Sequence, residues 1–363
     1  MPKREKWANE LINNNTIMLF KKLTFKTKNS MKKLTVGVDI GGTNTVSGLV
    51  DNEGKCYGTL SFKTRDFVVF DDYIDRLCQD INNLKKVAKI EYELAGIGIG
   101  APNANYFTGN IENPANLHWK DKAGNDLTII PFVEMVKRHF PSTPVAMTND
   151  ANAAALGEMY YGGAKGMQDF LVITLGTGLG SGFVSKGDVI YGHDSFAGEL
   201  GHICVEKGGR RCGCGNRGCL EAYVSAPGIK RTVFEVLAET NSTSELSNFT
   251  IENLESKDIY EAATRGDAVA LEAFERTGEV LGMGIAAAVA VTSPEAVFLF
   301  GGLAKSGKYI LEPTKKYMEQ YMLKNFRNKI KLLPSGIDSA NAAILGASAL
   351  AWQKYNQLHT DEK

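Results

Sequence analysis

One short pattern occurs twice in the sequence, and this repeat constrains the fold more than any other feature. Shifting the chain by 134 positions superposes five residues on identical ones: Gly42, Thr43, Ser47, Gly48 and Val50 fall on Gly176, Thr177, Ser181, Gly182 and Val184. In each copy an apolar stretch leads into a Gly/Thr turn and a second apolar stretch returns. Five identities can arise by chance in a chain with 38 glycines. The pattern nevertheless predicts two similar β-hairpins, which could hold a polyphosphate from opposite sides.

Strand and helix patterns alternate along the rest of the chain. Residues 34–40, 45–50 and 59–64 predict an antiparallel meander. Apolar residues recur at spacings of three and four from Tyr73 to Ala88, which predicts an amphipathic helix. Further strands are predicted at 94–100, 145–148 and 296–300, and further helices at 132–140, 152–161, 281–291 and 340–355. A polar break is expected at 241–248. This order predicts a mixed α/β architecture, and the length of 363 residues predicts about two domains.

The first 30 residues differ in charge from the remainder. The whole chain has no net charge, but this segment carries a net +5 and the rest a net −5. A mildly acidic body gives no general attraction for nucleic acid. The longest apolar run of the segment, residues 17–20, is too short for a signal peptide or a membrane span. We therefore expect a disordered basic extension at 1–30 and a cytoplasmic protein without a membrane or nucleic-acid partner. A transit peptide or an arm for an anionic partner is a weaker interpretation.

Four possible metal ligands lie close together in the second half of the chain. They fall within 18 residues, and nearby glycines allow a tight turn around an ion: His202, Cys212, Cys214 and Cys219. One imidazole and three thiolates make up the ligand set of a closed structural zinc site. The lack of a secretory signal argues against a disulfide framework. Redox cysteines are the alternative, although Cys-X-Cys differs from the usual Cys-X-X-Cys spacing. The other cysteines, Cys56, Cys78 and Cys204, fit ordinary buried thiols.

Two glycine-rich turns are candidates for phosphate binding. In the run from Asp39 to Asn44, backbone N–H groups can approach phosphate oxygens, Thr43 adds a hydroxyl donor, and Asp39 could hold Mg²⁺. The run 175–182 offers the same donors with less side-chain bulk. Either run alone could be a plain tight turn. Neither matches the Walker or dinucleotide pattern, so the repetition is what favours a shared phosphate ligand.

Three carboxylates are candidates for the chemistry. Asp150 follows a predicted strand and begins a predicted helix, where active-site groups gather in α/β sheets, but a helix N-cap is an equally simple interpretation. Glu199 lies three residues before His202, so a helix would place both side chains on one face. Glu221 follows Cys219 by two residues, and the same metal would position it. Each glutamate could also be an ordinary solvated group.

These motifs together resemble those of the ROK family of sugar kinases and repressors. The likeness extends from about residue 31 to about residue 355 and is most specific in the run from Cys212 to Glu221. Segment 113–119, which ends Asn116-Leu117-His118-Trp119, is similar to one in the family's glucokinase members. The resemblance implies an actin-like (ribonuclease H-like) ATPase fold with two lobes around a central cleft. Residues 31–148 plus a C-terminal helix at about 340–357 would form the small lobe, and residues 149–339 would form the large lobe with the zinc loop and a dimer surface.

The resemblance also implies an ATP-dependent hexose kinase, with glucokinase as the first expectation, and with Mg²⁺ and structural Zn²⁺ as metals. Asp150 would take the proton from the sugar 6-hydroxyl as it attacks the γ-phosphate. The sugar would be bound by Asn103, Asn149, Asp150, Glu199, His202 and Glu221. ATP would be bound by Asp39, Gly41, Gly42, Thr43, Asn44, Gly176, Thr177, Gly178, Gly301 and Gly302. Because His202 would serve both the metal and the sugar, zinc loss should damage sugar binding without affecting the nucleotide loops.

Alternatives within the same family stay open. N-acetylmannosamine kinase and fructokinase share the sugar-contacting residue types. A sugar-binding transcriptional repressor would carry an N-terminal helix-turn-helix module, for which the 30 residues before the fold are too few. Asn103 stands where the family commonly has Gly, which weakens its assignment to the sugar site. We expect the chain to form a homodimer and to act on a hexose.

Overall fold

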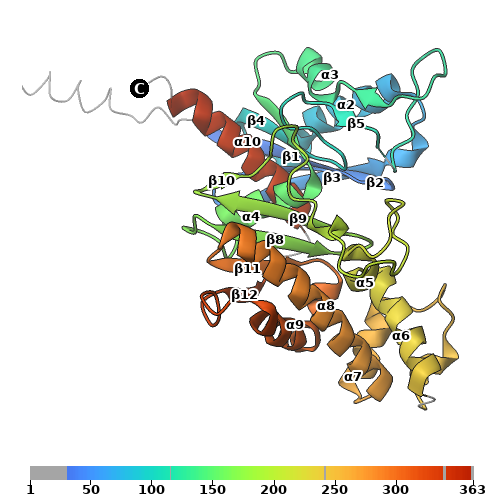
Figure 1. Cartoon of the computed structure of the whole chain (residues 1–363). Coiled ribbons are helices and arrows are strands. Elements are labelled where there is room, and N and C mark those ends of the chain that lie inside the picture. Colours follow the sequence, from blue (N-terminus) through green and yellow to red (C-terminus); the bar gives the residue numbers. More distant parts are fainter. Residues whose placement is uncertain (1–30, 115, 241–242, 338–340, 361–363) are drawn as a thin grey trace, which may run out of the picture.

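Two five-stranded sheets form the framework of the computed structural model, which describes residues 31–114, 116–240, 243–337 and 341–360 (Figure 1). The predicted extension 1–30 lies outside these ranges. The first sheet has the order β3 (Cys56–Lys63), β2 (Asn44–Val50), β1 (Lys32–Ile40), β4 (Tyr92–Gly100) and β7 (Val145–Thr148). The second has the order β10 (Asp188–Val189), β9 (Leu179–Ser185), β8 (Phe170–Leu175), β11 (Ala296–Phe300) and β12 (Lys331–Pro334). In both, an antiparallel meander is followed by two parallel strands. The predicted mixed α/β architecture is confirmed.

The sequence repeat corresponds to the first hairpin of each sheet. Strand β1 pairs Val38 with Ser47 of β2, and strand β8 pairs Ile173 with Ser181 of β9. The glycine after each serine faces a helix. A Cβ atom on Gly48 would lie 2.7 Å from the Ile344 side chain, and one on Gly182 would lie 2.7 Å from the backbone oxygen of Ala151. These two glycines allow α10 (Ala342–Thr360) and α4 (Asp150–Tyr161) to lie directly on their hairpins.

Helices α4 and α10 pack on one another between the two sheets. In Figure 1, α10 crosses the middle of the molecule, between the β1/β4 sheet above and the β8/β9 sheet below. A Cβ atom on Gly346 would collide with the backbone oxygen of Ala153, and one on Gly157 would lie 3.2 Å from the Cα atom of Gly346. Small residues therefore bring the two helix backbones close together at the junction of the lobes.

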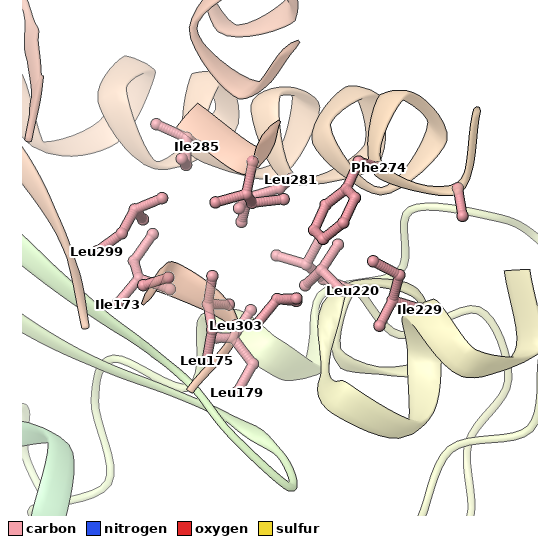
Figure 2. Packing of buried hydrophobic residues seen from close by; sticks show 14 of the residues in the cluster. Ile173, Leu175, Leu179, Leu220, Ile229, Phe274, Leu281, Ile285, Leu299 and Leu303 are labelled. Carbon is pink, nitrogen blue, oxygen red and sulfur yellow. The ribbon is translucent and has the colours of Figure 1, made fainter. Parts of the chain in front are cut away.

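Each sheet has its own apolar core. Helices α2 (Phe70–Ala88) and α3 (Phe132–His139) belong to the core of the first sheet, where the rings of Tyr73 and Trp119 lie 4.4 Å apart. The core of the second sheet is built with α8 (Ala268–Thr292), α9 (Lys308–Tyr321), α7 (Ser256–Thr264), α6 (Ala226–Thr240) and α5 (Glu221–Val224). Figure 2 shows Leu281 and Ile285 of α8 facing Ile173 and Leu299 of the sheet.

The remaining elements are short. They are β5 (Ile111–Glu112), β6 (Ile129–Ile130), η1 (Thr64–Asp66), η2 (Leu200–His202), η3 (Glu245–Asn248) and η4 (Leu303–Ser306). The break predicted at 241–248 falls between α6, which ends at Thr240, and α7, which begins at Ser256. Within this connection η3 forms a short 3₁₀ turn in which Ser244 Oγ accepts a hydrogen bond from Leu246 N. Residues 241–242 lie outside the described ranges. Helix α8 begins well before the predicted residue 281, since Asp267 caps it and apolar residues such as Phe274 extend its buried face.

Segments of the two lobes also touch beside the helices. The rings of Tyr106 and Tyr191 stack with centroids 4.0 Å apart. Tyr106 N donates to Ser195 Oγ at 2.7 Å, and Asn105 Nδ2 donates to the Asp194 backbone oxygen at 3.1 Å. These contacts join the lobes at a second place. Within the described residues, no helix combines the length and the apolar composition that crossing a bilayer requires.

Candidate active site

Most of the predicted site residues lie around one cleft between the sheets. The cleft holds about 710 Å³ and is lined by Asn103, Asn149, Asp150, Gly176, Thr177, Gly178, Glu199, His202, Glu221 and Gly301. Asp39 lines an adjoining cavity of about 230 Å³, which shares Asp150 and Thr174 with the cleft. The other predicted ATP residues line neither space: Gly41, Gly42, Thr43, Asn44 and Gly302. The fold thus brings the sugar candidates together with the second Gly/Thr turn.

Asp150 does not cap its helix. The cap is Asn149, whose Oδ1 accepts a hydrogen bond from Asn152 N at 2.7 Å. The Asp150 carboxylate accepts from Ala151 N at 2.8 Å and is otherwise open to the cleft. Because protein atoms replace much of the surrounding water, burial raises the pKa of Asp150 above the ordinary carboxyl range, and backbone N–H donors only partly offset this. The helix-capping interpretation of Asp150 is therefore wrong, and its carboxylate has the setting of a general base.

Asp39 lies near the end of β1, opposite Val46 in one neighbouring strand and Gly100 in the other. Burial, followed by the negative charge of Asp150, raises the pKa of Asp39 to about 6. Two carboxylates that repel each other in a partly buried cavity gain stability from a cation between or beside them. Oxygen ligands of this kind suit Mg²⁺.

Replacing Asp39 with asparagine should change how stability depends on pH. With a folded-state pKa of about 6 against an ordinary value of 3.8, Asp39 binds its proton more tightly in the folded state. Ionisation of Asp39 therefore lowers the free energy of unfolding as pH rises from about 4 to about 6. The free energy of unfolding of the wild type, minus that of Asp39→Asn, should fall by about 2 kcal/mol between pH 4 and pH 7.

Urea denaturation without Mg²⁺ or nucleotide measures this difference. Asp66→Asn is a matched control, because Asp66 is exposed and lies outside both cavities. Its stability should follow the wild type at every pH. Parallel curves for wild type and Asp39→Asn would show that Asp39 ionises as an ordinary carboxyl group.

The two Gly/Thr turns face different surroundings. In the first, a Cβ atom on Gly42 would lie 2.9 Å from the backbone oxygen of Asn116, so this turn is covered by the 116–119 segment. In the second, the space beside Gly176 is open. Gly301 has φ 101°, and its Cβ position lies 2.5 Å from the backbone oxygen of Leu175, so only glycine fits beside this turn. Phosphate oxygens can therefore reach the second turn most directly.

The ring of His202 faces two groups of different chemistry. His202 ends η2, the short 3₁₀ helix for which Glu199 is the preceding cap position. Its Nε2 lies 4.0 Å from the Glu199 carboxylate, and its Nδ1 lies 3.8 Å from the Cys212 sulfur. One nitrogen can thus bind a metal while the other faces the cleft.

The four predicted metal ligands come together as a compact group. The ligand atoms of His202, Cys212, Cys214 and Cys219 all lie within 4.8 Å of one another. The sulfurs of Cys214 and Cys219 are 3.7 Å apart. Ligands bound tetrahedrally at about 2.3 Å from zinc lie roughly 3.8 Å from each other, so this donor set fits the ion. These residues would hold Zn²⁺.

Glu221 links the metal loop to the second Gly/Thr turn. Its Oε2 accepts from Leu179 N at 2.9 Å, and its Oε1 accepts from the Cys212 thiol at 3.4 Å. A Cβ atom on Gly178 would lie 2.5 Å from Oε2, so glycine is what makes room for the carboxylate. Ala226 N, at the start of α6, donates to the Gly176 oxygen at 2.8 Å. The metal loop therefore supports the turn, which differs from the expectation that zinc loss leaves the nucleotide loops unaffected.

Two positions differ from the sequence interpretation. Cys204 is exposed and Cys56 is half-buried, so the prediction of buried thiols holds only for Cys78. Cys204 follows η2 on a surface segment, and the periodicity of the sequence does not show which residues lie next to that segment.

Asn103 has φ 55°, and its Nδ2 donates to the backbone oxygens of Glu112 and Asn113 at 3.0 and 2.9 Å. Glycine or asparagine suits this left-handed conformation, which accounts for the departure from the commoner Gly.

Sequence reasoning missed several residues that line the cleft. These are Asn116, Thr174, Ser181 and Phe196, with Phe300 on the side of β11. Thr174 could not be found from the repeat, because the shift of 134 positions superposes Asp39 on Ile173. The strand pairing, with Val38 opposite Ser47 and Ile173 opposite Ser181, is what places Thr174 at the position of Asp39. Phe196 has no comparable signal, because it lies in a loop that tertiary contacts bring to the cleft.

Comparisons with known proteins identify relatives of the chain. The sequence profile described as ROK family matches residues 35–354. A glucokinase from Halalkalibacterium halodurans is 32% identical over 332 residues, covering 89% of this chain and 96% of the relative. The crystal structure of a ROK family glucokinase from Streptomyces griseus with glucose and AMPPNP is similar at a TM-score of 0.71 and 31% identity, covering 88% of this chain and 99% of that one. A xylose repressor from Bacillus subtilis is 28% identical, covering 87% of this chain and 76% of the repressor.

Proposed function

The chain belongs to the ROK family and is an ATP-dependent sugar kinase, and we propose that it transfers the γ-phosphate of ATP to the 6-hydroxyl of glucose. One observation carries this proposal: a single cleft is shared by the Asp150 carboxylate, the open 176–178 turn and the Glu199/His202/Glu221 group. The Asp150 carboxylate provides a base. The turn provides hydrogen-bond donors for phosphate oxygens, and the Glu199/His202/Glu221 group provides hydrogen-bond partners for sugar hydroxyls. The nearly complete coverage of a glucokinase supports this assignment.

Asp150 acts as the general base in this proposal. Its raised pKa makes the Asp150 carboxylate a stronger base than an ordinary one, which suits it to accept the hydroxyl proton as the oxygen attacks. The backbone N–H groups of Thr177 and Gly178 orient the phosphates, while Gly176 N donates to the Gly178 oxygen at 3.0 Å and closes the turn. Phosphoryl transfer depends mainly on positioning and on neutralising charge. Asp39 would hold Mg²⁺, which neutralises phosphate charge when bound. Gly301 and Gly302 would meet the adenosine end, while Gly41, Gly42, Thr43 and Asn44 would approach the phosphates only once the lobes close.

The sugar is held by polar groups that project from three elements. Asn149, Glu199 and Glu221 offer acceptors for hydroxyl protons, and the Nε2 atom of His202 faces the same space. The Nδ2 group of Asn103 donates its hydrogen bonds within the small lobe, so its Oδ1 remains as an acceptor for a sugar hydroxyl. Structural Zn²⁺ on the four-ligand loop would fix His202 and Glu221 in place.

A coupled ADP-release assay tests the function. Glucose should give the highest kcat/KM among glucose, mannose, fructose, N-acetylglucosamine and N-acetylmannosamine. A higher value for fructose or N-acetylmannosamine would reassign the chain to one of the alternative kinases. No ADP release with any sugar would contradict the kinase assignment and favour a sugar-responsive regulator, for which the likeness to a xylose repressor is the supporting observation.

The proposal includes a homodimer and no nucleic-acid or membrane partner. An apolar groove of about 400 Å³ runs beside Glu199, lined by Phe183, Ile190, Leu200 and Val291 among others. Val291 is 86% exposed at the end of α8. A second copy of the chain would cover this surface.

Glu221→Ala should weaken nucleotide binding even without sugar. The substitution removes the acceptor for Leu179 N and so loosens the 176–178 turn. The affinity for ADP, measured by calorimetry in the absence of sugar, should fall about tenfold, as expected for a charge-assisted hydrogen bond. Glu199→Ala is the matched control, because Glu199 lines the same cleft but its carboxylate faces His202 rather than the turn. Equal ADP affinities for the two variants would contradict the structural link.

A further inference from the structure

The exposed thiol of Cys204 lies directly opposite one of the metal ligands. Cys204 and Cys219 form an isolated antiparallel β-bridge. The flanking backbone hydrogen bonds run from Val205 N to the Gly218 oxygen at 2.8 Å and from Leu220 N to the Ile203 oxygen at 3.0 Å. Because these bonds lie on either side of the pair and none joins it, the two cysteines form a non-hydrogen-bonded pair.

That pairing has a defined geometry. Residues in a non-hydrogen-bonded pair have Cα atoms about 4.5 Å apart and side chains on the same face. A disulfide accepts Cα separations of roughly 4.4–6.8 Å, so the backbone already has the spacing of a cross-strand disulfide. The Cys204 sulfur also lies close to the residue before Cys219, because a Cβ atom on Gly218 would lie 3.3 Å from it. The sulfur thus leans toward the strand that carries Cys219.

The two thiols differ in accessibility and in role. Cys204 is exposed, whereas Cys219 is only 1% exposed and belongs to the four-ligand group. Cys204 lies outside that group, and its thiol donates weakly to the Arg217 backbone oxygen at 3.9 Å. A reagent from solution can therefore reach Cys204 first, and Cys219 is placed to react with it next.

We propose that Cys204 and Cys219 form a reversible disulfide that withdraws one thiolate from the metal site. The oxidant is a low-molecular-weight disulfide, RSSR. The Cys204 thiolate attacks one sulfur of RSSR, forming a mixed disulfide and releasing RS⁻. The Cys219 thiolate then attacks the Cys204 sulfur, forming the protein disulfide and releasing the second RS⁻. Two protein thiolates are oxidised, and RSSR is reduced to two thiolates.

This reaction would couple the redox state of the surroundings to the cleft. A site left with His202, Cys212 and Cys214 has lost one of its four ligands and should release its zinc. Cys212 contacts Glu221, and Glu221 holds the Leu179 backbone, so the loss is transmitted toward the 176–178 turn. The disulfide itself needs neither sugar nor nucleotide, and its formation is independent of the proposed kinase activity.

The experiment treats the full-length, zinc-loaded protein with oxidised glutathione. Peptide mapping by mass spectrometry should identify a Cys204–Cys219 disulfide. Zinc release, followed with a chromogenic chelator, should accompany its formation, and dithiothreitol with added zinc should reverse both. Cys204→Ser should keep its zinc before oxidation, because Cys204 is no ligand, and should release it about tenfold more slowly than the wild type.

Cys56→Ser is the matched control, since Cys56 is a partly exposed thiol on β3, far from the loop in sequence. It should lose zinc as fast as the wild type. Equal release rates for Cys204→Ser and wild type, a mapped disulfide within the Cys212/Cys214/Cys219 group, or no disulfide after prolonged treatment would each overturn the proposal. The mapping remains decisive even for protein prepared without zinc, because it reads the sulfur–sulfur bond directly.

Discussion

Asp150→Asn should lower kcat by two to four orders of magnitude, the range over which general bases contribute. The asparagine side chain keeps nearly the same volume but cannot accept the hydroxyl proton. Helix α4 should still form, because Asn149 and not Asp150 provides its cap. Steady-state ADP release measures the rate, and calorimetry should find glucose affinity changed by only a few-fold, since a single hydrogen bond to the sugar is altered.

The control for this variant is again Asp66→Asn, an exposed aspartate outside the cleft, which should have wild-type kinetics. Turnover of Asp150→Asn within about tenfold of the wild type would mean that another group removes the proton or that none is needed. A loss of glucose binding equal to the loss of kcat would instead assign Asp150 to substrate binding.

Removing the metal should have the second largest effect. We expect about one zinc per chain, as a single four-ligand site implies. Chelation, or the substitution Cys214→Ser, should reduce kcat/KM for glucose by about 10- to 100-fold, because His202 and Glu221 lose the support that orients them. Nucleotide affinity should fall as well, since Glu221 bonds to Leu179 N and Ala226 N bonds to the Gly176 oxygen.

Metal analysis and glucose kinetics on the same preparations check this prediction. Cys78→Ser is unsuitable as a control because Cys78 is buried in the first core. Cys56→Ser is suitable, and it should retain both zinc and activity. A zinc-free preparation with full kcat/KM would remove any role of the metal in the cleft, while an unchanged nucleotide affinity would limit that role to the sugar side.

The sequence predicts those parts of the site that depend on local pattern. Hairpin turns, the metal-ligand spacing and the strand-to-helix junction at Asp150 all involve residues close together in the chain, and their positions follow from periodicity and turn chemistry. The bond between Glu221 and Leu179 joins residues 42 positions apart, and the approach of Asn116 to Gly42 depends on how the 116–119 segment folds back. Such contacts are set by tertiary packing, which no local pattern encodes.

Exposure was the other property that the sequence could not supply. The sequence around Cys204 is compatible with a buried position, but in the fold Cys204 pairs with Cys219 and its side chain is exposed. The start of α8 was missed because its first turns mix charged and apolar residues, and their burial follows from the neighbouring helices. The exact boundaries of the lobes at 148 and 339 stay a prediction.

The matched order of the two sheets has a consequence for the chemistry. A duplicated scaffold related by an approximate twofold would present identical groups to a ligand at its centre. Phosphoryl transfer is directional, so the two halves must offer different charges to the donor and the acceptor. The register of the hairpins places Asp39 of one half where the other has Thr174, and both side chains line the cavity beside Asp150. This carboxylate-for-hydroxyl difference breaks the symmetry at the centre of the molecule. Under the proposed function, Asp39 would hold the cation in one half, and Thr174 would leave the other half free to bind uncharged hydroxyls or phosphate oxygens.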